Sequence, residues 1–106
     1  MIRPETTRMF AEAAEAATVA AAQRAANRAR IATLAARLAA APPPSVLTCA
    51  RGSSDHAATY AKYLIETRIG IVTASQAPSV ASVYGVAPKV AGALCLAISQ
   101  SGRSPD

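Results

Sequence analysis

The chain has 106 residues, enough for one small domain, and apolar residues make up 52% of it, so material for a core is present. Aromatic residues account for only 4%, and the formal net charge of +5 comes from 11 basic and 6 acidic residues. No apolar stretch reaches the roughly 18 residues of a membrane span, and no secretory signal pattern is visible, so we expect a cytoplasmic protein that has no membrane partner.

Residues 1–41 form the first predicted segment. Positions 5–40 contain no Gly or Pro and are rich in Ala, the residue with the highest helix propensity, which predicts one long helix or two joined by a soft bend. Thr6 or Thr7 is expected to cap its start, and the three prolines at 42–44 must end it.

This helical segment is basic. Six arginines fall in the first forty positions: Arg3, Arg8, Arg24, Arg28, Arg30 and Arg37. A basic helix is compatible with a nucleic acid or an anionic membrane, but a solvated face or a face packed on a partner subunit is the simpler interpretation, so no nucleic acid is expected.

Residues 45–106 change in character and predict an α/β fold. Short apolar runs at 45–50, 71–74 and 93–98 read as strands, and the segments 55–68 and 78–84 read as helices. Alternating strands and helices are typical of a parallel sheet, and the uniformly apolar strands predict helices on both faces.

The predicted helix 55–68 has an expected inner face and an expected outer ion pair. The inner face consists of Tyr60, Ala61, Leu64 and Ile65. Lys62 and Glu66, spaced i and i+4, are placed outside it.

Two loops carry hydroxyl groups and glycine. Gly52, Ser53 and Ser54 follow the first predicted strand, and Ser99-Gln100-Ser101-Gly102-Arg103-Ser104 follows the third. Small residues and hydroxyl donors beside a helix N-terminus suit an anion such as phosphate. If the strand order is 2-1-3, both loops emerge side by side at the switch point of the sheet.

The remaining polar residues admit two interpretations each. His56 can contact a ligand or act as an acid–base group, but a capping or surface role in a first helical turn is favoured. Arg51 and Arg103 are candidate phosphate partners that can equally pair with a nearby Asp. Cys49 and Cys95 lie in apolar runs and are expected to be buried free thiols, with no metal or cofactor site indicated.

Four segments together resemble SIS (sugar isomerase) domains, over roughly residues 46–106. The similarity is to the isomerase part of glutamine–fructose-6-phosphate aminotransferase, and more to stand-alone double-SIS proteins of the glucosamine-6-phosphate deaminase type. The segments are 51–58, 61–67, 77–84 and 98–106.

The resemblance implies a flavodoxin-like three-layer α/β/α domain, usually repeated twice in a chain and forming a homodimer. It implies that a hexose or aminosugar phosphate is held by Gly52, Ser53, Ser54, Ser99, Gln100, Ser101 and Ser104. The family's catalytic residues lie beyond the end of this sequence, so the expected role here is phosphate binding without a complete catalytic site.

The last residues, Ser104-Pro105-Asp106, have the pattern of a helix start, so we expect 45–106 to be the first part of a longer domain. The intact protein is expected to be an isomerase, deaminase or aminotransferase acting on aminosugar phosphates. The alternative is a sugar-phosphate-sensing regulatory SIS module without catalysis, which would carry a helix-turn-helix ahead of the domain. Direction of reaction and sugar epimer stay open.

Overall fold

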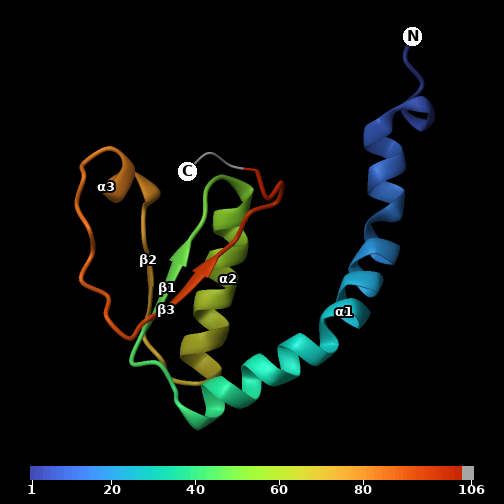
Figure 1. The fold of residues 1–106 in the computed structure, drawn as a ribbon. Coiled ribbons are helices and arrows are strands. Elements are labelled where there is room, and N and C mark those ends of the chain that lie inside the picture. Colours follow the sequence, from blue (N-terminus) through green and yellow to red (C-terminus); the bar gives the residue numbers. More distant parts are fainter. Residues whose placement is uncertain (104–106) are drawn as a thin grey trace. The chain divides into compact units, whose positions relative to one another are not determined.

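The computed structural model describes residues 1–103, and the predicted helix start at Ser104 lies outside them (Figure 1). The chain divides into two compact units, one up to Ala41 and one from Pro42 onward. The element order is helical in the first unit and alternates between strands and helices in the second.

The first unit is a short 3-10 turn, η1 (Pro4–Thr6), followed by one long helix, α1 (Arg8–Ala40). The Phe10 N–H donates a 3.2 Å hydrogen bond to Thr7 Oγ1, so Thr7 is the cap, one of the two candidates. Figure 1 shows that α1 curves along its length without a break. No residue of α1 is buried, and none of the helices within residues 1–103 has the length and apolar character needed to cross a membrane.

The second unit contains a three-stranded parallel sheet with the order β2-β1-β3. Its strands are β1 (Val46–Cys49), β2 (Thr73–Ser75) and β3 (Leu94–Ala97), joined through the helices α2 (Ser53–Arg68) and α3 (Pro78–Ser82). Val46 pairs with Thr73 on one side and with Leu94 on the other. The predicted alternation and the strand order 2-1-3 are both confirmed, so the turns after all three strands emerge at one edge of the sheet.

One face of the sheet packs against α2. Val46, Thr48 and Thr73 on the strands and Ala58 on the helix are each at most 2% exposed. The two threonines have nearly the same shape as valine. Among the described residues, no buried side-chain nitrogen or oxygen atom lacks a hydrogen-bond partner. This small cluster is the centre of the second unit.

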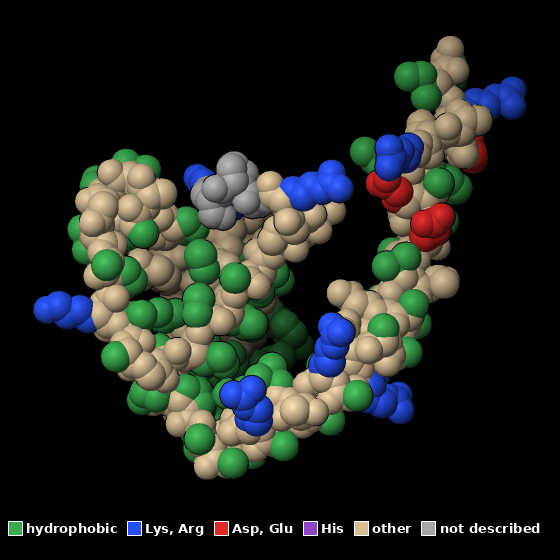
Figure 2. Space-filling model, in the orientation of Figure 1, with side chains coloured by type: hydrophobic (Ala, Val, Ile, Leu, Met, Phe, Trp, Pro, Cys, Tyr) green, Lys and Arg blue, Asp and Glu red, His purple; other side chains and the backbone are tan. Residues whose placement is uncertain are grey.

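The opposite face of the sheet carries the residues that alternate with this cluster. Cys95 and Ala97 of β3 and Ala74 of β2 are exposed, and Leu47 and Cys49 of β1 are half-buried. Hydrophobic side chains gather over the strands in the view of Figure 2. The prediction of two buried thiols is therefore wrong for Cys95, because the alternation of the strand turns its side chain away from α2.

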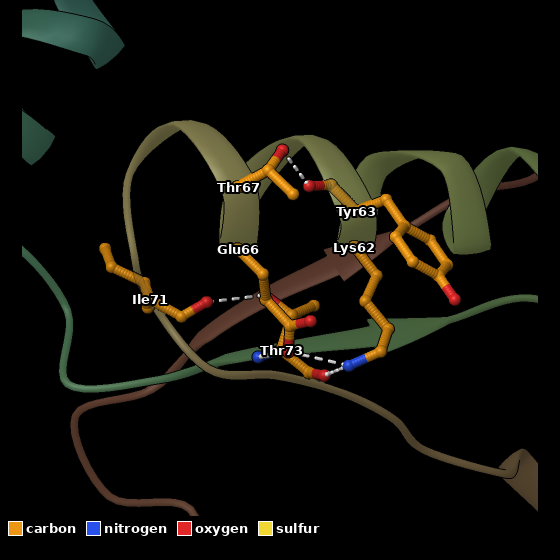
Figure 3. Close-up of polar contacts among 6 residues, drawn as sticks. All are labelled: Lys62, Tyr63, Glu66, Thr67, Ile71 and Thr73. Atoms are coloured by element: carbon orange, nitrogen blue, oxygen red, sulfur yellow. Dashed lines mark hydrogen bonds and ion pairs between the residues drawn. The ribbon is translucent and has the colours of Figure 1, made fainter.

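The predicted inner face of α2 is also partly wrong. Tyr60 is 68% exposed and Leu64 is 40% exposed, although Ala61 and Ile65 are half-buried as expected. The Lys62–Glu66 pair exists, but it lies on the sheet side of α2 and not outside it (Figure 3). The charged ends of both side chains reach the backbone of β2 at Thr73.

Candidate functional site

The turn between β1 and α2 is built on Gly52. Its φ of 59° and ψ of −134° lie in a region that residues with a Cβ rarely adopt, and Gly52 is the N-cap of α2. Ser53 and Ser54 are therefore the first two residues of α2 and not part of a loop, so this helix starts two residues earlier than predicted. Their backbone N–H groups have no acceptor within the helix, as at any helix start.

The loop after β3 uses its own serines to hold its shape. The Gly102 N–H donates to Ser99 Oγ at 3.0 Å, and the Arg103 N–H donates to Ser101 Oγ at 3.1 Å. These bonds occupy two backbone N–H donors, which are then not available to a phosphate. A serine hydroxyl that accepts a bond still has its own proton to donate, so Ser99 and Ser101 remain donors toward a ligand.

The turns after β1 and β3 meet in a hollow of about 110 Å³. We call it the first hollow, and its lining residues are Cys49, Ala50, Arg51, Ser54, Pro78, Ala97, Ile98 and Ser99. Two serines and an arginine line it, and no Asp or Glu within residues 1–103 does. Its volume is several times the ~30 Å³ of a liquid water molecule, which gives room for one tetrahedral oxyanion.

Only part of the predicted set lies in this first hollow. Ser54 and Ser99 line it, together with Arg51, whereas Ser53, Gln100, Ser101, His56 and Arg103 do not. His56 is exposed on α2, and Ser104 lies outside the described residues. The structure thus brings one serine from each predicted loop together.

A second hollow of about 330 Å³ lies between the β1–α2 turn and the segment that follows β2. Its lining residues are Ala50, Arg51, Gly52, Asp55, Ser75, Gln76, Ala77, Pro78 and Ser79. Sequence reasoning missed the part that follows β2. The signal was present, because the order 2-1-3 also brings the carboxyl end of β2 beside that of β1.

The start of β2 is fixed by a clamp from α2, formed by Lys62, Glu66 and Thr73 (Figure 3). Lys62 Nζ donates to Glu66 Oε1 and to the Thr73 carbonyl, both at 2.6 Å, and the Thr73 N–H donates to Glu66 Oε1 at 3.0 Å. The two side chains thus provide hydrogen-bond partners for the N–H and carbonyl of Thr73 at the edge of the sheet. No further strand in the described part of the chain pairs with these groups. The strand β2 begins at Thr73, two residues later than predicted, and the Val72 carbonyl just before it accepts a 2.9 Å hydrogen bond from the Val46 N–H.

The clamp also has an electrostatic consequence. The hydrogen bond from Lys62, and next that from the Thr73 N–H, lower the pKa of the Glu66 carboxyl below its ordinary value, against a smaller opposing effect of desolvation. The carboxylate is the form that accepts both bonds. Elsewhere within residues 1–103, no group of three or more His, Cys, Asp or Glu residues is placed to hold a metal ion.

Comparison with solved structures finds a similar protein from Silicibacter pomeroyi DSS-3, described as a "putative phosphosugar isomerase". The two chains share 48% sequence identity with a TM-score of 0.71, over 78% of this chain. The present chain spans 26% of the length of that protein. No family model matches the sequence, and no curated protein matches it. The parallel sheet and the long N-terminal helix are consistent with part of a flavodoxin-like SIS fold, and the similarity supports a sugar isomerase-like α/β domain.

Proposed function

We propose that the chain binds a sugar phosphate and that the phosphate group occupies the first hollow. The observation that carries the proposal is the meeting of Ser54 and Ser99 with Arg51 in one hollow at the carboxyl edge of a parallel sheet. Phosphate is a tetrahedral anion that needs several hydrogen-bond donors and positive charge, and these groups provide both. The similarity to a protein described as a phosphosugar isomerase supports the same class of ligand.

Within the intact protein, we propose that this binding serves an isomerase, deaminase or aminotransferase acting on glucosamine 6-phosphate or fructose 6-phosphate in a homodimer. The phosphate is remote from the carbons that react in such chemistry. Its binding energy orients the sugar, which raises the effective concentration of reactive groups supplied from elsewhere. No catalytic residue is assigned to this chain.

The proposal is tested by titrating the chain with glucosamine 6-phosphate and with unphosphorylated glucosamine in a calorimeter. We expect binding of the phosphorylated sugar alone. Ser54→Ala and Ser99→Ala each remove one hydrogen bond to a charged group, which is worth about 1.5 to 3 kcal/mol, so each is expected to weaken binding about tenfold or more.

Ser45→Ala is the matched control, because Ser45 precedes β1 at the opposite end of that strand and lines neither hollow. We expect it to bind like the unaltered chain. Equal binding of both sugars, or equal losses in all three variants, would contradict phosphate recognition at the first hollow.

A further inference from the structure

The first hollow is too small for a whole sugar phosphate. Sites that enclose small molecules have volumes of about 300 to 1,000 Å³, whereas the first hollow has about 110 Å³. The second hollow has about 330 Å³ and so falls within that range. A ligand whose phosphate lies in the first hollow must therefore extend beyond it.

The two hollows are neighbours that share part of their walls. Ala50, Arg51 and Pro78 line both of them. The β1–α2 turn contributes the first two of these residues, and Pro78 begins α3. The shared lining places the two hollows side by side, so a ligand that extends out of the first hollow meets the second next to it.

We propose that the second hollow binds the hydroxyl-bearing carbon chain of the sugar phosphate, with Gln76 and Ser79 as the residues that recognise it. This inference rests on the proposed function of the first hollow, because that function sets where the phosphate lies. The amide of Gln76 both donates and accepts hydrogen bonds, and so does the hydroxyl of Ser79, which matches the dual character of sugar hydroxyl groups.

The charged residues of the two hollows indicate which end of the ligand lies in which hollow. Asp55 lines the second hollow, and among the described residues no acidic residue lines the first. A phosphate in the second hollow would meet a like charge, whereas a sugar hydroxyl can donate a hydrogen bond to a carboxylate. Within residues 1–103 the Asp55 carboxylate has no hydrogen bond or ion pair of its own.

The backbone that carries Gln76 is held in place. Its N–H donates to the Thr48 carbonyl at 2.7 Å, which continues the pairing of β2 with β1 by one residue. The side chains of Gln76 and Ser79 are half-buried and form no hydrogen bond within the described residues. Their polar groups are thus positioned by the sheet edge and by α3 without being used by the fold.

The test compares two ligands on the full chain. Glucosamine 6-phosphate is titrated beside inorganic phosphate, which lacks the carbon chain, against Gln76→Ala, Ser79→Ala and the unaltered protein. Gln23→Ala is the matched control, since Gln23 is exposed on α1 and lines neither hollow. Circular dichroism of every variant checks that its fold is intact, and the two separate substitutions keep a readout if one of them unfolds.

We expect Gln76→Ala and Ser79→Ala each to weaken the binding of glucosamine 6-phosphate about three- to tenfold, the effect of one lost hydrogen bond, and to leave inorganic phosphate within about twofold. Unchanged sugar-phosphate affinity in both variants overturns this inference while the proposed function stands. Equal loss for both ligands also overturns it, because the residues would then support the phosphate site. No binding of either ligand by the unaltered chain overturns the proposed function itself.

Discussion

Glu66 lies at the contact between α2 and the start of β2, where its carboxylate accepts hydrogen bonds from Lys62 and from the Thr73 backbone. Substitution by Gln keeps the shape but removes the charge that both donors favour. We expect Glu66→Gln to lower the midpoint of thermal unfolding. Glu12→Gln is the control, because the Arg8–Glu12 pair is mostly exposed on α1 and such pairs contribute little.

The same carboxylate gives the stability of the second unit a dependence on pH. Because the folded chain holds the pKa of Glu66 below its ordinary value of 4.5, the stabilisation is fully present above that value and is lost as the pH falls through the folded pKa. The midpoint temperature of thermal unfolding should therefore fall more steeply below about pH 4.5 for the unaltered chain than for Glu66→Gln. Parallel pH curves for the two proteins would show that the clamp does not form in solution.

Gly52 is the other residue whose conformation bears on the site. A Cβ there would meet no atom within 4 Å, so the cost of Gly52→Ala is the backbone conformation alone. For a residue with a Cβ in this region we expect a loss of about 1 to 3 kcal/mol in the free energy of unfolding, measured with urea. Relaxation of the turn should also move Ser54 and weaken phosphate binding.

Ala57→Gly separates these two effects. Ala57 is exposed on α2, and glycine there costs about 1 kcal/mol of helix stability without altering the turn. If it weakens phosphate binding as much as Gly52→Ala does, the turn conformation has no special role.

At the scale of elements, the sequence allowed the topology to be predicted because the signals were local and strong. The prolines at 42–44 and Gly70 interrupt the chain, and the apolar runs between such breaks became the strands. The predicted ends of elements were wrong where tertiary contacts determine them. The strand β2 begins at Thr73, whose outer backbone groups bond to Lys62 and Glu66 of α2, a contact that no local sequence pattern indicates.

The site was predictable to the same extent. Ser54 and Ser99 were found because hydroxyl groups follow neighbouring strands, a relation that topology alone provides. Which of two adjacent serines faces the hollow depends on where α2 begins, and Ser53 and Ser54 favour turns and helix caps equally by residue type. The lining from β2 and α3 was missed because Gln76 and Ser79 form no recognisable motif on their own.

At the scale of the whole molecule, the buried core is small. Val46 and Ala58 are the buried hydrophobic residues of the described part, while Tyr60, Tyr63 and Tyr84 are each more than 60% exposed. Basic side chains are spread along α1 (Figure 2). We therefore expect a ligand that binds only the folded state to raise the midpoint of thermal unfolding, because it adds free energy to a small total.

The two cysteines can be used as separate probes: Cys49 for the first hollow, and Cys95 for the sheet face that does not pack against α2. Cys49 is half-buried and lines the first hollow, whereas Cys95 is exposed two register positions away on β3 and lines neither hollow. We therefore expect a thiol reagent to modify Cys95 faster, when each is studied alone in the Cys49→Ala and Cys95→Ala variants. Glucosamine 6-phosphate at ten times its Kd should slow modification of Cys49 about tenfold, since only the unliganded chain reacts.

The rate for Cys95 should not change with the ligand, which makes it the internal control. Equal protection of both thiols would mean that the ligand closes the whole sheet face instead of filling a hollow at its edge. A Cys95 that reacts only after unfolding would show that this face is covered in solution, which contradicts its exposure here. The pair of rates thus separates a local site at the carboxyl ends of the strands from an effect spread over the sheet.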